Sequence, residues 1–315
     1  MKNVTSKVLL LVICLVFLPT TVISQDTYDQ EYDLYMKADA EKSRAKREAL
    51  LVQFVQTYPK SDLDPTVSYL YSQIYQSLQK SGQWKSIAAK AEKFLRHRPD
   101  DSTSIQAATQ AYQQLGNVQK LVSFGSKLYS EKPSSTTASL VATAYQSLGD
   151  TARLRTWAER ALRHNSSNLT MLQALAASYW GTNEMPKAAN YAKRGLSAVS
   201  KSSQKETLNT LRGFFHQTVG ELAFQQKKMG AALKSFENST KYSPENDYSH
   251  KRLGDIHWGA GKSEQAILSF AKAVVLKGSA SKEARERLYQ LYRSVHSNTS
   301  GLPVLLRNVR KDMGL

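Results

Sequence analysis

Small and apolar residues recur along this chain at a helical spacing, and the pattern of these positions repeats with a period of 34 residues. Pro99 and Pro133 mark two ends of this period, and Gly82 and Gly116 lie at the same place within it. A fixed period of this length is typical of arrays of paired helices, in which every pair packs against the next. The pattern therefore predicts an all-α protein, and arrays of this kind bind other molecules more often than they transform them.

Each repeated residue type has a physical role in such a helical pair. A small residue near the middle of each helix lets the two helices approach closely. A glycine supplies the left-handed backbone that ends the first helix, and a proline stops the second. A single pair is too small to bury its own apolar face, so neighbouring pairs share one continuous core.

The clearest copy of the pattern runs from Asp247 to Gly278 and contains Leu253, Gly254, Gly261, Ala266, Phe270 and Ala273. Looser copies precede it, marked by Tyr112, Tyr145 and Tyr179 at intervals of 33 and 34 residues. Together these residues resemble the tetratricopeptide repeat (TPR). The resemblance implies a right-handed superhelical solenoid of about seven tetratricopeptide helical hairpins plus a C-terminal capping helix.

The repeats and the departures from them predict six segments. They are a signal peptide (1–24), a degenerate N-terminal helical hairpin (25–59), repeats two to five (60–200), an insertion (201–212), repeats six and seven (213–278) and C-terminal capping helices (279–315). The insertion is rich in serine and lysine, and we interpret it as a longer loop or an extended helix. A hinge between two sub-arrays is the alternative.

The first 24 residues have the pattern of a cleavable secretory signal. Lys2 and Lys7 accompany an apolar run, Val8–Leu18, that is too short to span a bilayer comfortably. Cleavage is expected after Ser24, which predicts a periplasmic or secreted protein. Cys14 is the only cysteine and lies in this signal, so the mature chain has no disulfide and no thiolate metal site.

The formal charge of +17 becomes +15 once the two signal lysines are removed. A basic surface suits acidic partners, either acidic proteins or anionic polymers of the cell envelope. The export signal and the scattered placement of the charges argue against nucleic acid. The sequons at Asn165, Asn168, Asn238 and Asn298 would carry glycans only in a eukaryotic secretory pathway. The cysteine-free mature chain favours a bacterial, and hence periplasmic, protein.

Motifs of catalytic chemistry are absent from the sequence. It contains no Gly-rich phosphate loop, no His-Glu-x-x-His and no Gly-x-Ser-x-Gly. His250 and His257 lie seven residues apart on one side of an expected helix, but Asp255 projects to a different side, so both histidines are interpreted as structural. Acidic residues lie among lysines, as is typical of solvated helix faces. We therefore expect no enzyme activity, no cofactor and no metal.

The resemblance also implies that the first helix of each hairpin lines a concave surface. In the C-terminal half the positions concerned hold aromatic residues and cations, which predicts a partner-binding groove formed by Trp180, Phe224, Trp258, Tyr292, Tyr248, Lys251, Lys282 and Arg285. Aromatic rings anchor partners and cations attract acidic ones. Packing of the rings against the next repeat is the alternative. In the N-terminal half the same positions are polar and nearly uncharged, among them Gln106, Gln110, Thr136 and Thr143.

These observations predict a non-enzymatic, exported TPR scaffold or adaptor. Its unidentified partner is expected to be a protein or peptide that the concave groove holds, and the basic charge of the chain suits an acidic one. The alternative is a binder of an anionic envelope polysaccharide or glycan. Ionic strength separates the two, because binding to a polyanion weakens steeply with salt whereas binding through aromatic anchors resists it.

Overall fold

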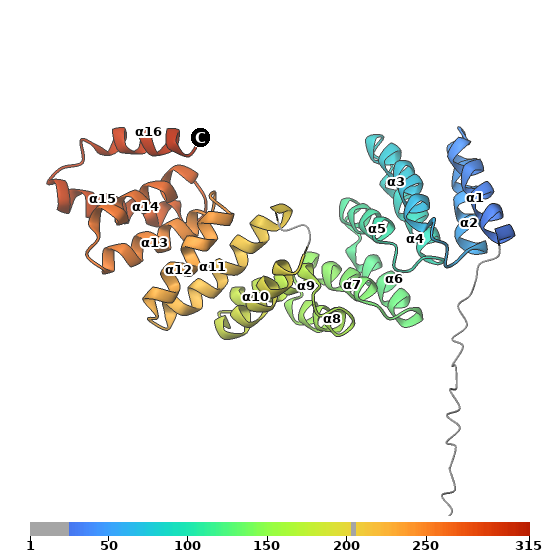
Figure 1. The fold of residues 1–315 in the computed structure, drawn as a ribbon, viewed down its shortest axis with the longest axis horizontal. Coiled ribbons are helices and arrows are strands. Elements are labelled where there is room, and N and C mark those ends of the chain that lie inside the picture. The colour runs from blue at the N-terminus through green and yellow to red at the C-terminus, as the bar shows by residue number, and fades with distance from the viewer. Residues whose placement is uncertain (1–24, 203–205) are drawn as a thin grey trace, which may run out of the picture. The chain divides into compact units, whose positions relative to one another are not determined.

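The computed structural model describes residues 25–202 and 206–315 of the chain (Figure 1). The expected signal peptide, 1–24, and residues 203–205 of the expected insertion lie outside the described residues. The described part of the chain forms sixteen α-helices and one short 3₁₀ helix, without a β-strand. The prediction of an all-α fold is confirmed.

The chain divides into two compact units, residues 1–77 and residues 78–315, with the boundary inside one helix. The described part of the first unit contains α1 (Gln25–Ala40), α2 (Arg44–Thr57) and most of α3 (Asp64–Lys80). Leu51, Phe54 and Tyr71 are fully buried in its core. Ser61 donates a hydrogen bond of 2.7 Å to the Glu31 carboxylate, so these two buried polar side chains satisfy each other.

The second unit contains the remaining helices, which follow one another as short antiparallel pairs. They are α4 (Trp84–Leu95), α5 (Ser102–Gln114), α6 (Val118–Glu131), α7 (Ser135–Ser147), α8 (Thr151–His164), α9 (Leu169–Gly181), α10 (Met185–Ser200), α11 (Asn209–Gln225), α12 (Met229–Tyr242), α13 (Asp247–Gly259), α14 (Ser263–Leu276), α15 (Ser281–His296) and α16 (Leu302–Asp312). The 3₁₀ helix, Glu206–Leu208, directly precedes α11.

Neighbouring helices of the second unit pack closely because small residues lie at their crossing points. A Cβ atom added to Gly254 of α13 would lie 2.5 Å from the ring of Phe270 on α14, so only glycine leaves room for this buried ring. In the same way, Gly195 of α10 faces the ring of Phe215 on α11. The close approach predicted from the small residues is therefore confirmed at Gly254.

Apolar residues of the last three helices form one cluster at the C-terminal end. Phe270 and Val274 of α14 pack there with Leu288 of α15 and with Leu302 and Val309 of α16.

Within the described residues, no helix has the combined length and apolar character that a bilayer span requires.

The turn between the two helices of a pair holds one residue with left-handed backbone, as the glycine positions predicted. These residues are Gly82, Gly116, Gly149, Asn183, Lys227 and Gly261, with φ values from 57° to 71°. Lys227 is the unexpected member, because a side chain with a Cβ atom is disfavoured in this conformation. Its φ of 57° matches that of its glycine and asparagine counterparts, so the stacking of α11 on α12 imposes the turn on this lysine.

Replacement of Lys227 by glycine is therefore expected to stabilise the protein. The variant should raise the free energy of unfolding by about 0.5–1 kcal/mol, because relief of the strained backbone exceeds the added entropy of the unfolded chain. Gly261→Ala should lower it by about 1 kcal/mol for the converse reason. Urea unfolding followed by circular dichroism measures both. Lys228→Gly is the control, because Lys228 has a φ of −84°; a gain there as well would contradict the strain argument.

Candidate functional site

The eight residues of the predicted C-terminal groove lie on four first helices. Trp180 is on α9, Phe224 on α11, Tyr248, Lys251 and Trp258 on α13, and Lys282, Arg285 and Tyr292 on α15. The five aromatic rings are half-buried, Lys251 is buried, and Lys282 and Arg285 are exposed. The structure thus places these residues on consecutive first helices but in three different environments.

The aromatic rings of this set make contacts within the protein. Trp180 meets Tyr248 edge-on, with 5.6 Å between ring centroids. Trp258 meets the buried Phe270 edge-on at 6.2 Å, and Tyr292 packs against the same C-terminal cluster. These contacts agree with the packing alternative for Trp258 and Tyr292, while their role as partner anchors stays a prediction.

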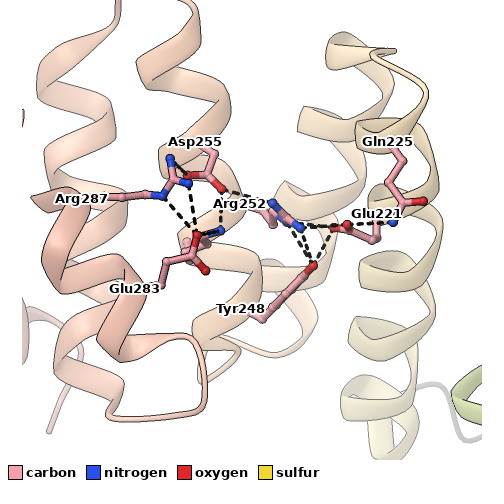
Figure 2. A network of polar contacts seen from close by, with 8 residues as sticks. Glu221, Gln225, Tyr248, Arg252, Asp255, Glu283 and Arg287 are labelled. Carbon is pink, nitrogen blue, oxygen red and sulfur yellow. Dashed lines mark hydrogen bonds and ion pairs between the residues drawn. The ribbon is translucent and has the colours of Figure 1, made fainter. Parts of the chain in front are cut away.

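A network of charged and polar residues connects α11, α13 and α15 (Figure 2). At one end, Arg252 holds Glu221 with two hydrogen bonds, from Nε to Oε2 at 2.9 Å and from Nη2 to Oε1 at 2.8 Å. The Tyr248 hydroxyl donates to Glu221 Oε2 at 2.7 Å. The guanidinium of Arg252 also lies 4.5 Å from the ring centroid of Phe224. Burial raises the pKa of Tyr248, so its hydroxyl stays a donor.

At the other end of the network, Lys251 is the central cation. Its Nζ lies 3.0 Å from Asp255 Oδ2 and 2.7 Å from Glu283 Oε1, and its side chain is only 4% exposed. Arg287 approaches both carboxylates, at 3.3 Å from Asp255 Oδ1 and 3.2 Å from Glu283 Oε1. The hydrogen bond from Lys251 lowers the pKa of Glu283, so this carboxylate is ionised at neutral pH.

Sequence reasoning missed most of this network. The expectation that acidic residues lie on solvated faces is wrong for Glu221 and Asp255, whose side chains are 5% and 8% exposed. One signal was available, since Lys251 with Asp255 and Glu283 with Arg287 are opposite charges four residues apart on first helices. As a result, the charge of Lys251 is already neutralised by two carboxylates, and only Lys282 and Arg285 of the predicted cations remain exposed.

An open groove lies in the N-terminal part of the second unit, along the first helices α5, α7 and α9. Its volume is about 620 Å³, and its lining contains Ser102, Ile105, Gln106, Thr109, Gln110, Gln113, Thr136, Ser139, Leu140, Thr143 and Thr170. Gln106, Gln110, Thr136 and Thr143 of this lining are among the positions that the resemblance placed on the concave surface. None of the eleven carries a charge, although lysine and arginine make up 43 of the 315 residues of the chain.

Many polar side chains of this groove have hydrogen-bonding capacity left over. Ser139 donates to the backbone of Ser135 at 2.7 Å and accepts from Asn168 at 3.1 Å, so it is held in place. By contrast, the side chains of Gln106, Gln110, Thr136, Thr143 and Thr170 make no hydrogen bond to any described residue. Ile105 and Leu140 supply an apolar floor. The groove therefore offers unused donors and acceptors above an aliphatic surface.

Neither histidine of α13 takes part in a metal-binding group within the described residues. His250 is buried, and its Nε2 lies 2.9 Å from the carbonyl oxygen of Pro244, which fixes the ring. Burial lowers the pKa of His250, so the ring is neutral at pH 7 and donates its Nε2 proton to that carbonyl.

Comparison with known proteins shows the fold. No protein-family model matches the sequence, and no curated protein does. Among solved structures, the chain is similar to a chain of the APC/C Cut9–Hcn1 hetero-tetramer, with a TM-score of 0.52 and 11% identity over 84% of this chain and 49% of that one. It is also similar to BtubC from P. vanneervenii, with a TM-score of 0.50 and 16% identity over 66% of this chain and 90% of that one.

A third similar structure is YrrB, described as a TPR protein with an unusual peptide-binding site. It has a TM-score of 0.48 and 14% identity over 62% of this chain and 97% of that one. The chain spans about half the length of the Cut9–Hcn1 chain that it matches. The fold is that of the tetratricopeptide-repeat solenoids, in agreement with the repeat pattern of the sequence.

Proposed function

We propose that this protein is an exported, non-enzymatic TPR scaffold that binds an extended segment of another protein along its first helices. The groove across α5, α7 and α9 is the observation that carries this proposal. Three consecutive first helices contribute to one open surface, and its lining is mostly polar and carries no charge. A segment that lies across several helices in turn contacts residues from each of them, which suits an extended chain better than a compact ligand.

The chemistry of the groove indicates how such a segment binds. Each glutamine side chain offers one carbonyl acceptor and two N–H donors, which complement the N–H and C=O groups of a peptide backbone. Ile105 and Leu140 provide an apolar surface for small side chains between these contacts. Because no charged residue lines the groove, the bound stretch is expected to be uncharged, since an unpaired charge would lose hydration there.

The alternative function is binding of an anionic envelope polysaccharide. It is supported by the formal charge, which is +17 for the whole chain and +15 without the two signal lysines, and by the exposed Lys282 and Arg285. The groove itself does not favour it, because no cation lines that surface. Export to the periplasm or beyond is part of the proposal under either function, and it rests on the signal pattern of residues 1–24.

Photocrosslinking in cells tests the proposal. A photoreactive residue at Gln110, inside the groove, is expected to capture a discrete protein, whereas the same residue at Ser123 on the outer helix α6 is not. Thr143→Trp fills the groove and should abolish the product at Gln110, and a neutral contact surface predicts that the product persists when the salt concentration is raised. Equal products at Gln110 and Ser123, or a product that survives Thr143→Trp, would place the partner elsewhere.

A further inference from the structure

Of the ion pairs in the charged network, Lys251 with Glu283 has the largest difference in solvent exposure between its two side chains. The lysine side chain is 4% exposed, whereas the glutamate side chain is 52% exposed and reaches Lys251 Nζ from the solvent side at 2.7 Å. Arg287 donates to the same carboxylate oxygen of Glu283, through Nη2 at 3.2 Å and Nε at 3.3 Å. A single solvent-exposed carboxylate therefore covers a buried ammonium and a half-buried guanidinium.

The charges of the network balance only while this carboxylate is in place. Its cations are Lys251, Arg252 and Arg287, and its anions are Glu221, Asp255 and Glu283. Without Glu283, three cations face two carboxylates, which leaves a net charge of +1. Glu221 is held by two hydrogen bonds from Arg252, and Asp255 is shared among all three cations. Two carboxylates thus remain for three cations when Glu283 moves away, although Asp255 Oδ1 accepts no hydrogen bond from a described residue and lies 3.3 Å from Arg287.

We propose that Glu283 occupies the place of a partner's carboxylate, and that an acidic peptide segment binds here by displacing it from Lys251 and Arg287. The exchange of one carboxylate for another conserves the ion pairs of both cations. Lys251 also keeps Asp255 at 3.0 Å throughout, so its charge is never left unpaired. The cost of the exchange is therefore small compared with the removal of a buried ion.

The surroundings of this site favour an acidic segment. Lys282 and Arg285 are exposed on α15 beside Glu283, and neither makes an ion pair with another described residue. Glu286 is the opposing charge on the same helix and is exposed as well. With Glu283 displaced, these residues together with Arg287 leave an excess of positive charge, which attracts acidic chains and raises their rate of association. This site is separate from the uncharged groove on α5, α7 and α9 and does not depend on it.

Glu283→Gln tests the exchange, because it keeps the shape of the side chain but removes the competing charge. Fluorescence anisotropy with a labelled oligoglutamate peptide should show about tenfold tighter binding to this variant than to the parent residues 25–315 at low salt. Glu286→Gln is the matched control, since it changes the net charge equally on the same helix outside the network, and it should leave affinity within about twofold. Adding Arg287→Gln to Glu283→Gln should remove most of the gain.

Several outcomes would overturn the inference. Equal gains in peptide affinity from Glu283→Gln and Glu286→Gln would mean that only the net charge of the protein matters. Absence of peptide binding by Glu283→Gln would show that there is no such site. A gain for polygalacturonate but not for oligoglutamate would assign the site to a carboxylated polysaccharide instead. Thermal unfolding of each variant verifies that it is folded. Crosslinking at Gln110 is unaffected by these substitutions, so failure here and failure of the proposed groove are distinguishable.

Discussion

Replacement of Glu221 by alanine is expected to lower the free energy of unfolding by about 3–5 kcal/mol. The Glu221 side chain is 5% exposed and accepts hydrogen bonds from Arg252 and Tyr248. Its removal leaves the Arg252 guanidinium, whose side chain is 18% exposed, without its bidentate partner in a region that water reaches poorly. Charged groups left in such a place cost far more than the ion pair itself contributes. Urea unfolding followed by circular dichroism measures the change.

A double variant distinguishes two contributions to this cost: the loss of the ion pair itself and the burial of an unpaired Arg252 guanidinium. Glu221→Leu with Arg252→Met removes one anion and one cation together, so the network stays balanced and most of the stability should return. Asp100→Asn is the control for an exposed pair, because the Asp100 and Lys132 side chains are 47% and 53% exposed, and it should cost less than about 1 kcal/mol. Equal costs for Glu221→Ala and Asp100→Asn would show that the network is solvated.

The fold followed from the sequence because each local rule agreed with the others. Gly261, Phe270 and Ala273 occupy repeat positions at which a helix pair needs a left-handed turn or a buried contact. The structure places Gly261 in that turn and Phe270 against Gly254. A periodic pattern states the same structural requirement many times along the chain. The fold can therefore still be predicted when a single position departs from the pattern. Lys227 is such a departure, since it occupies the left-handed position although lysine gives no local signal for it.

The candidate sites could be predicted less well from the sequence than the fold, because they depend on which side chains become buried. In the sequence, Lys251 and Asp255 look like an ordinary solvated pair four residues apart. Only the packing of α13 against α12, α14 and α15 removes them from water. The sequence marked Gln106 and Thr143 as polar members of the inner face, but it did not show that the surface between them is open. Whether such positions form a groove depends on the spacing of successive helices, which the one-dimensional pattern does not contain.

Gly195→Ala is expected to lower the free energy of unfolding by about 1–3 kcal/mol, although alanine usually favours a helix. A Cβ atom at Gly195 would lie 2.3 Å from two ring carbons of Phe215, which is fully buried. The ring is therefore forced away from α10, and the cost of this displacement exceeds the gain in helix propensity of up to about 1 kcal/mol. Gly230→Ala is the matched control, because its Cβ meets open space within α12, and it should stabilise the protein.

Gly195 and Phe215 lie on opposite sides of the segment 201–212, so this variant also tests how firmly α10 and α11 are joined. A second substitution, Phe215→Leu, makes room for the new methyl group, and the two changes together should cost less than the sum of their separate costs. If Phe215 anchors α11 on α10, Gly195→Ala should also increase tryptic cleavage at Lys201, because the weakened contact exposes the connecting segment more often. Stabilisation by Gly195→Ala, with cleavage unchanged, would mean that the ring does not rest on this glycine and that the segment joins two independent sub-arrays.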